Sequence, residues 1–221
     1  MAKRVLDTVL SLATIIGLLP VYVVLAAAIK LASKDPVLFR QERAGRYGRP
    51  FMLYKFRTMR TDADPFGPSP RSGQDQRLTR IGRFLREYSL DELPQLWNVL
   101  KGDMSLVGPR PLYVAQMAEW DQRQRRRLEV TPGLTGLAQI AGRGELTREE
   151  KLELDVRYVE TATAWLDLKI LVATVGLVLG HKAIYERQYS LTEKTRGGAS
   201  PGTASTPAPC PQVTRPSPQY R

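Results

Sequence analysis

The feature that most restricts the fold is an almost wholly apolar run over residues 5–31, interrupted near its middle by Pro20. A proline inside a helix lacks a backbone donor and clashes with the preceding turn, so it bends or breaks the helix. Each half then forms roughly 18–20 Å of helix, too short to cross a bilayer but long enough to enter one leaflet. The run predicts either a re-entrant helical hairpin bent at Pro20 or a single kinked span.

Basic residues flank this run on both sides, with Lys3 and Arg4 before it and Lys30 and Lys34 within or after its end. The positive-inside rule then gives no orientation for this segment across the membrane. This is the pattern expected if both of its ends stay on the cytoplasmic side. A signal peptide is disfavoured because no small-residue cleavage site leads into a polar mature start. Asp7 is unfavourable in apolar surroundings, and we expect it to pair with Lys3 or Arg4 at headgroup level.

The charge balance predicts an anionic partner. Lys and Arg number 33 against 22 Asp and Glu, a net charge of +11. Nucleic acid, anionic lipid or a phosphorylated substrate would each match this excess. The single cysteine, Cys210, and the single histidine, His181, give little support to a disulfide, a zinc site of the usual type or a Ser-His-Asp triad. Any chemistry must therefore use carboxylates, Lys, Arg, Tyr and hydroxyls.

The remaining sequence predicts an α+β domain that is mainly helical and contains a small β-hairpin. Strands are expected at 37–43 and 51–59, a loop at 61–77, helices at 81–88, 92–100, 112–130 and 148–160, a short extended segment at 134–140, and an apolar core or interfacial helix at 166–185. The tail after about Ser190 is rich in Gly, Ala, Ser, Thr and Pro, which predicts disorder. We therefore expect a membrane segment at 1–35, a cytosolic domain at 36–190 and a disordered tail at 191–221.

Two adjacent carboxylates, Asp91 and Glu92, lie at an expected helix start. Ser89 and Glu92 have the spacing of a capping box, and Pro94 is tolerated only in a first turn. The simpler interpretation is that the carboxylates cap the helix and complement its dipole. A carboxylate held there at low pKa can also attack phosphorus while its neighbour holds Mg²⁺. The two interpretations are compatible.

Several cations are candidates for phosphate binding. Arg110 lies between Pro109 and Pro111, and a stiff backbone lowers the entropy lost when a guanidinium binds phosphate. Lys55 and Arg57 alternate with apolar residues, so both are expected on one strand face, in contact with phosphate or with water.

The same ambiguity applies to Arg86, which precedes the carboxylates. The basic residues of 123–127 are expected to be solvated or to face lipid headgroups. Asp155 alone would be interpreted as a helix-surface carboxylate.

Taken together, these motifs resemble the bacterial sugar transferase family, the monotopic phosphoglycosyl transferases. The matching segments are Lys-Arg-x-x-Asp at 3–7, Leu-Tyr-Lys-Phe-Arg-Thr-Met at 53–59, Ser-Leu-Asp-Glu-Leu-Pro-Gln-Leu-Trp-Asn-Val-Leu-Lys-Gly-Asp-Met-Ser at 89–105, Gly-Pro-Arg-Pro at 108–111, Pro-Gly-Leu-Thr-Gly at 132–136 and Glu-Leu-Asp-Val-x-Tyr-Val at 153–159. They cover roughly residues 1–190 in the family's order. The departure is Leu19 before Pro20, where related sequences often have serine.

The resemblance implies a mechanism. Asp91 would attack the β-phosphate of a UDP-sugar and release UMP, and polyprenol (undecaprenyl) phosphate would then take the phosphosugar, starting a surface glycan. The resemblance assigns Glu92 to Mg²⁺, with Asp91 beside the ion. Further residues that it places near the site, with individual roles left open, are Lys55, Arg86, Arg110, Arg143 and Asp155. It also implies a re-entrant helix in the cytoplasmic face of the bacterial inner membrane, contact with membrane lipids, no nucleic-acid partner and scope for oligomers.

Two other functions compete with this one. A basic, membrane-tethered module that binds nucleic acid or anionic lipid would explain the net charge, but it leaves the motifs at 89–95 and 108–111 without a role. A two-carboxylate glycosidase ranks last, because adjacent residues rarely face each other across a sugar at the ~5–9 Å that such enzymes need.

Overall fold

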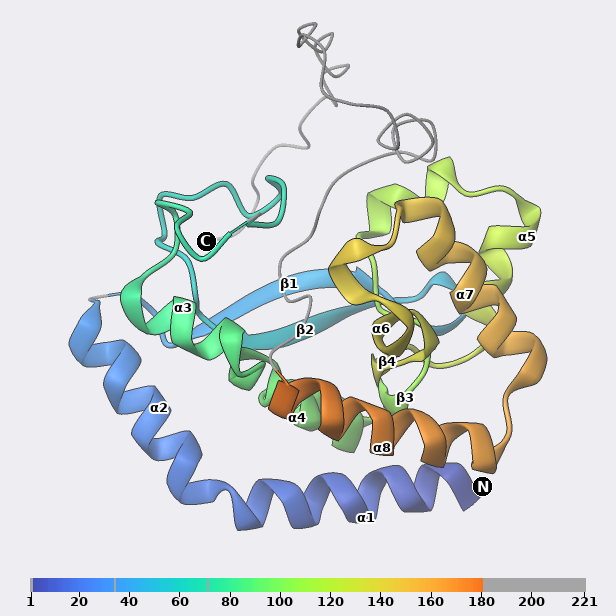
Figure 1. Cartoon of the computed structure of the whole chain (residues 1–221), viewed down its shortest axis with the longest axis horizontal. Coiled ribbons are helices and arrows are strands. Elements are labelled where there is room, and N and C mark those ends of the chain that lie inside the picture. The colour runs from blue at the N-terminus through green and yellow to red at the C-terminus, as the bar shows by residue number, and fades with distance from the viewer. Residues whose placement is uncertain (1, 34, 71, 181–221) are drawn as a thin grey trace, which may run out of the picture.

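The computed structural model describes residues 2–33, 35–70 and 72–180, which form helices packed around two small sheets (Figure 1). The helices are α1 (Ala2–Gly17), α2 (Leu19–Ala32), α3 (Arg80–Glu87), α4 (Gln95–Lys101), α5 (Gln122–Arg125), α6 (Leu137–Ala141), α7 (Arg148–Thr161) and α8 (Ala164–Gly180). The strands are β1 (Leu38–Ala44), β2 (Pro50–Phe56), β3 (Ser105–Val107) and β4 (Gly133–Thr135). Short 3₁₀ turns are η1 (Arg46–Gly48), η2 (Leu90–Glu92), η3 (Val114–Glu119), η4 (Arg126–Glu129) and η5 (Arg143–Glu145). The expected α+β class with a predominance of helix is confirmed.

The expected hairpin is formed by β1 and β2, which pair antiparallel from Leu38 opposite Phe56 to Ala44 opposite Pro50. A second, parallel pair, β3 with β4, is not predicted by the sequence. Its strands have three residues each, too few to show alternation. A Cβ on Gly133 would lie 2.0 Å from the Gly108 nitrogen, so glycine is required where these backbones meet.

The apolar N-terminal run folds as two helices bent by 62°, with the break at Leu18. Pro20 lies in the first turn of α2, where its missing N–H costs no bond within α2. The expected bend is thus confirmed. None of the described helices is long and apolar enough to cross a membrane by itself, whereas α1 and α2 together pass that test of length and composition.

The start of α1 is attached to the body of the protein by polar contacts. The Asp7 carboxylate accepts hydrogen bonds from Ser105 Oγ at 2.7 Å and from the Leu106 amide at 3.2 Å. Lys3 Nζ pairs with Asp167 at 2.5 Å instead. The expected pairing of Asp7 with Lys3 or Arg4 is therefore wrong, because α1 packs on β3 and Asp7 meets donors there.

The same two helices contribute apolar side chains to the core. Leu25 and Ile29 of α2 form one buried cluster with Phe56 and Leu85, and Ile15 of α1 packs against the larger central cluster. Side chains from both sides of the expected boundary at residue 35 share these clusters, and the division into a membrane segment and a cytosolic domain stays a prediction.

The prediction of one long helix at 112–130 is wrong. The structure has η3, α5 and η4 there, and Trp120 between them is extended, with φ −85° and ψ 134°. Trp120 packs in a buried cluster with Ala44 and Leu152. Asp121 then caps a new helical turn by accepting from the Gln124 amide. Burial of the indole overrides the helical propensity of the segment.

Two further segments differ from expectation in part. The region 134–140 is extended only through β4 and then turns into α6. The apolar region 166–185 is helical as α8 from Ala164 to Gly180. Its last residues, His181, Cys210 and the whole tail at 191–221 lie outside the described residues, so the expected disorder of the tail stays a prediction.

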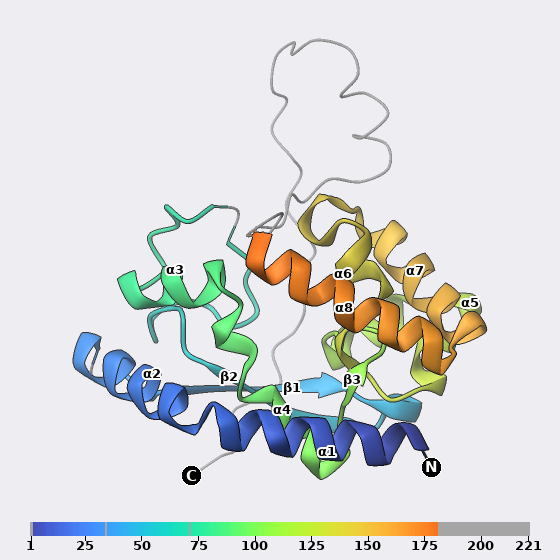
Figure 2. The same ribbon diagram turned by 60° about the horizontal axis from the view of Figure 1, so that its bottom comes forward.

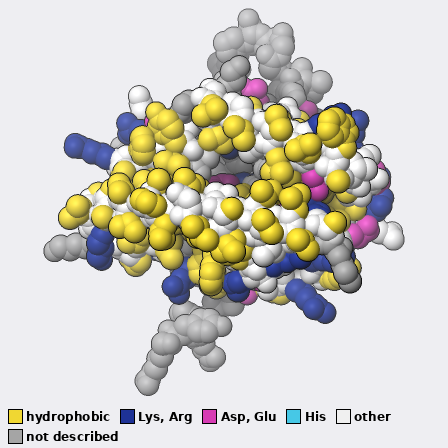
Figure 3. Space-filling view, turned by 90° about the horizontal axis from the view of Figure 1, so that it is seen from below, with side chains coloured by type: hydrophobic (Ala, Val, Ile, Leu, Met, Phe, Trp, Pro, Cys, Tyr) yellow, Lys and Arg dark blue, Asp and Glu magenta, His cyan; other side chains and the backbone are white. Residues whose placement is uncertain are grey.

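α1 and α8 run along one side of the molecule, and α2 continues from α1 at its edge (Figures 1 and 2). These helices expose large apolar side chains on that side. They are Val5, Leu6, Val9, Leu12, Ile16, Leu19, Val23, Val24 and Leu31 from α1–α2, and Trp165, Leu168, Val172, Val175 and Leu179 from α8. We call this set the apolar face. Figure 3 shows it directly, with a hollow near its centre in which acidic atoms are visible.

Candidate active site

The two carboxylates lie in η2, immediately after a residue in left-handed conformation. Ser89 has φ 55° and ψ 19°, and its side chain does not cap the turn. The expected capping box is therefore wrong, because this backbone directs the Ser89 hydroxyl to Arg143, whose Nη2 donates to it at 3.2 Å. Pro94 follows in helical conformation before α4, consistent with its expected place in a first turn.

Glu92 is the centre of an ion-pair cluster in which Glu92 and Lys55 are mostly buried and Arg110 is 40% exposed. Its Oε1 accepts from Lys55 Nζ at 3.0 Å and from Arg110 Nη2 at 2.5 Å, and its Oε2 lies 3.4 Å from Arg110 Nη1. Burial by itself would raise the pKa of Glu92, but Arg110 and Lys55 hold it well below its ordinary value. Burial also lowers the pKa of Lys55, against the attraction of Glu92. Glu92 is thus anionic and fixed between β2 and the Gly-Pro-Arg-Pro loop.

Asp91 is in a different environment. It is 6% exposed, and among the described residues its carboxylate accepts no hydrogen bond. Burial raises the pKa of Asp91, Lys55 opposes that shift, and the neighbouring Glu92 adds to it. The expected low pKa is therefore wrong for this structure, because burial outweighs the field of a single 3₁₀ turn. A cation beside Asp91 would favour its ionised form.

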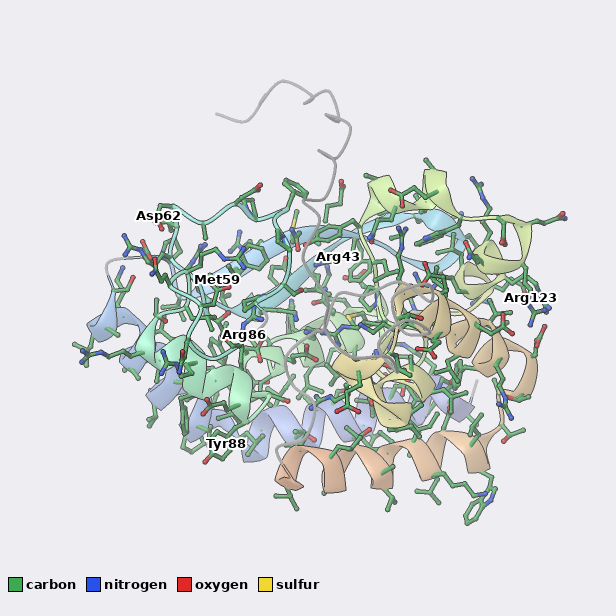
Figure 4. The ribbon with its side chains drawn as sticks, turned by 45° about the horizontal axis from the view of Figure 1, so that its top comes forward. Arg43, Met59, Asp62, Arg86, Tyr88 and Arg123 are labelled. Atoms are coloured by element: carbon green, nitrogen blue, oxygen red, sulfur yellow. The ribbon has the colours of Figure 1, made fainter. Side chains whose placement is uncertain are left out.

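Two further arginines border the carboxylates. Arg86 of α3 lies beside Met59 (Figure 4) and donates from Nε to Thr58 Oγ1 at 2.9 Å. Its charge lowers the pKa of Asp91. Arg143 has φ 46°, an uncommon conformation for a non-glycine residue, and within the described residues its buried Nη1 has no partner. Such a donor is suited to a ligand oxygen.

Arg57 is not brought to this cluster. Its Nε donates to the Pro36 carbonyl at 2.9 Å, and its Nη2 lies 3.5 Å from the Leu38 carbonyl. Because β2 ends at Phe56, the alternation expected to direct Lys55 and Arg57 to one face does not extend to Arg57.

Asp155 does not contact the carboxylates but supports Arg110. It is buried in α7, and Arg127 Nη2 donates both to Asp155 Oδ2 and to the Arg110 carbonyl, each at 2.6 Å. Burial raises the pKa of Asp155 to about 6, against the opposing charge of Arg127, and within the described residues its buried Oδ1 has no hydrogen-bond partner. The expected surface position of Asp155 is wrong, and the pair holds the Arg110 backbone through the bond from Arg127 to the Arg110 carbonyl.

Arg127 is the residue that sequence reasoning misses. The sequence groups it with the solvated cations of 123–127, yet its side chain is 3% exposed and its guanidinium lies 4.8 Å from the Trp120 ring centroid. Arg123 and Arg126 do lie at the surface, paired with glutamates of α7 (Figure 4). No sequence signal separates Arg127 from these neighbours, because its burial depends on the broken helix around Trp120.

The donor set is compatible with a magnesium ion. No group of three or more His, Cys, Asp or Glu side chains that would hold a metal occurs in the described part of the chain. Mg²⁺ is commonly bound by one or two carboxylates together with substrate phosphates. Asp91 accepts no donor from the described residues, and Glu92 Oε2 has only the long contact to Arg110. The carboxylate pair therefore fits an ion that a diphosphate brings with it.

Comparison with known proteins finds relatives over most of the chain. The model of the family "Bacterial sugar transferase" matches residues 1–181. The chain is 48% identical over 171 residues to the "Uncharacterized sugar transferase EpsL" of Bacillus subtilis, covering 77% of this chain and 84% of that protein. It is 46% identical over 192 residues to a "UDP-glucose:undecaprenyl-phosphate glucose-1-phosphate transferase" of Caulobacter vibrioides, covering 80% and 69%.

A third relative is the "Galactosyl transferase CpsE" of Streptococcus agalactiae, 44% identical over 192 residues, or 80% of this chain. The match covers 42% of that protein and 40% of a Xanthomonas campestris glucose-1-phosphate transferase, so the chain spans less than half of these two relatives. The family match nevertheless extends from α1 through α8, including both carboxylates and every cation described around them. The chain belongs to the bacterial sugar transferase family.

Proposed function

We propose that the protein is a phosphoglycosyl transferase that moves a sugar-1-phosphate from a UDP-sugar to polyprenol phosphate, undecaprenyl phosphate in bacteria, and so starts a surface glycan. The observation that carries this proposal is the carboxylate pair surrounded by Lys55, Arg110 and two further arginines. Relatives named as UDP-glucose:undecaprenyl-phosphate glucose-1-phosphate transferases support it. The sugar itself is left to experiment.

In the first step, an Asp91 carboxylate oxygen attacks the β-phosphorus of the UDP-sugar. The bond from that phosphorus to the bridging oxygen breaks, UMP leaves with the electron pair, and a phosphosugar remains on Asp91 as an acyl phosphate. In the second step, a phosphate oxygen of polyprenol phosphate attacks the same phosphorus. The Asp91 carboxylate is released and a polyprenyl-diphospho-sugar is formed.

The surrounding residues bind and orient the diphosphate. Arg110 and Lys55 present fixed positive charge beside Asp91, and Arg143 has an unpartnered donor for a phosphate or uridine oxygen. Glu92, with Asp91 next to it, would hold Mg²⁺, which supplies charge neutralisation of the diphosphate when bound. The contacts of Arg57 with the start of β1 give it no part in this step.

The first experiment measures UMP release over a panel of UDP-sugars, with polyprenol phosphate in detergent. At least one UDP-sugar should give UMP in the presence of Mg²⁺, and EDTA should remove the activity until Mg²⁺ is restored, because uncompensated diphosphate repels the attacking carboxylate. No release from any UDP-sugar would contradict the proposal. Release at the same rate in EDTA would contradict the assignment of Mg²⁺.

We further propose that the apolar face rests in the cytoplasmic leaflet of the inner membrane, with α1–α2 as a re-entrant element. Exposed apolar patches of this extent are unfavourable in water, and neither α1 nor α2 has the length to cross alone. Figure 3 shows a hollow with acidic atoms on this side, and in this proposal a lipid-linked phosphate held in the leaflet enters there.

Charged substitutions on the apolar face should weaken membrane binding. In Val172→Glu/Val175→Glu, two exposed positions of α8 acquire charges whose burial in lipid is costly, so less protein should float with phospholipid vesicles. Phe66→Glu is the matched control, because Phe66 is 73% exposed in the loop between β2 and α3, and that loop lies across the molecule from α1 and α8 (Figure 1). Equal flotation of the double variant and the wild type would contradict the assignment.

A nucleic-acid-binding module is not favoured by the structure. The surface arginines of 123–126 are largely paired with glutamates or backbone carbonyls, so they do not present a set of unpaired cations to phosphates.

A further inference from the structure

The hydrophobic cluster under the active site is built on α2. Its buried members are Leu25, Ile29, Phe56 and Leu85, and Tyr22, Leu90 and Leu93 are among the residues that pack against it. Each of these partners from outside α2 is the sequence neighbour of a site residue: Phe56 follows Lys55, Leu85 precedes Arg86, and Leu90 and Leu93 flank the carboxylate pair. Three of the elements that carry site residues, β2, α3 and η2, therefore pack against α2 through this cluster.

Tyr22 adds a directional contact to this packing. Its hydroxyl donates to the Leu93 carbonyl at 2.8 Å, and its ring lies against Phe56 with centroids 5.8 Å apart. Leu93 directly follows Glu92, and it packs against both major clusters. The hydrogen bond thus fixes the backbone at the point where η2 leads into α4.

The other side of α2 belongs to the apolar face. Val23 and Val24, next to Tyr22 in sequence, are 62% and 64% exposed. If one side of α2 contacts lipid, a change in its tilt or depth in the membrane moves the helix. Because packed interiors are stiff, the site residues that pack on its other side must then move with it. Tyr22 is the polar contact that joins this helix to the carboxylate-bearing turn.

We infer that Tyr22 is a positioning residue for the carboxylate pair. Through its hydrogen bond to Leu93, the position of α2 in the membrane determines where Glu92 lies relative to Lys55 and Arg110. This inference rests on the proposed function. In this inference, α2 contributes to the rate of catalysis as well as to membrane attachment. Tyr22 touches no reacting group, so its effect should appear in kcat for UMP release rather than in binding of the UDP-sugar.

The test is Tyr22→Phe, which removes the hydroxyl and keeps the ring against Phe56. In lipid nanodiscs we expect kcat to fall about 10-fold, the order expected from losing one well-placed hydrogen bond, with KM for the UDP-sugar unchanged within about twofold. In detergent, where α2 is not held by a bilayer, wild type and variant should differ less. Tyr47→Phe is the control, because Tyr47 is 65% exposed in η1 and should retain wild-type kcat.

Thermal unfolding and vesicle flotation are measured on the same proteins. Flotation should match the wild type, and the melting temperature should fall by only about 2–4 °C, as expected for one lost hydrogen bond. An unchanged kcat in nanodiscs would overturn the inference, and so would a fall in kcat accompanied by a loss of flotation or by a fall in melting temperature well beyond that expected for one hydrogen bond. A wild type that releases no UMP from any UDP-sugar would instead refute the proposed function. An active wild type with an equally active Tyr22→Phe refutes only the role of Tyr22.

Discussion

Asp91→Asn should lower UMP release by at least about 10³-fold and abolish the covalent phosphosugar adduct, because an amide replaces the attacking carboxylate with almost no change in shape. The adduct is measured by intact-protein mass spectrometry after mixing with UDP-sugar alone, when the second step cannot occur. Wild-type protein should gain the mass of one phosphosugar.

The control for this variant is Asp62→Asn, which makes the same chemical change in the exposed loop before α3, where Asp62 pairs with Arg60 (Figure 4). It should retain both the adduct and turnover. An adduct that persists in Asp91→Asn, or that maps to another side chain, would remove Asp91 from the role of nucleophile. Loss of the adduct with turnover intact would exclude a covalent route.

Arg127→Met should reduce the free energy of unfolding by about 3 kcal/mol, because it leaves the Asp155 carboxylate buried without its partner. For a domain of this size the melting temperature should fall by roughly 10 °C. Adding Asp155→Leu should recover most of this loss, since both members of the pair are shifted unfavourably by burial and apolar replacements of a buried pair are often neutral or stabilising.

Activity should not recover in the Arg127→Met/Asp155→Leu double variant. Without the pair, the Arg110 carbonyl loses its hydrogen bond from Arg127, and kcat for UMP release should stay at least about 10-fold below wild type. A double variant with wild-type kcat would show that the two prolines beside Arg110 are enough to hold it.

The dependence on pH gives a second readout of the pair. Burial raises the pKa of Asp155 to about 6, above its ordinary value in the unfolded chain, so the protonated form is favoured on folding. The resulting stabilisation is present below about pH 4 and is lost as pH rises through 6, a change of roughly 3 kcal/mol. The unfolding free energy of the wild type should therefore fall with pH relative to that of the double variant.

Much of the arrangement could be predicted because its signals are local. The bend follows from a proline in an apolar run, the hairpin from alternation, and the convergence of Lys55, Arg110 and the carboxylates from motifs shared with the family. The proline and the alternation lie within a few residues of the features that they predict, whereas the convergence of the site residues follows from the resemblance to the family.

The errors have a common origin in tertiary packing. The left-handed backbone of Ser89, the burial of Asp91 and the broken helix around Trp120 all depend on partners far away in sequence. Arg127 illustrates this most clearly, since the preceding residue, Arg126, has the same side chain and forms ion pairs at the surface. The contact with Asp155, 28 positions on, is what distinguishes Arg127.

The bond between Lys3 and Asp167 joins residues 164 positions apart, and Asp7 meets Ser105 after 98. During synthesis α1 therefore leaves the ribosome long before its polar partners exist. Its apolar side chains must be sheltered elsewhere in the meantime, and early insertion into lipid would provide that shelter. The last contacts can close only when α8 has been made, so α1 waits for its polar partners until synthesis of the described domain is almost complete.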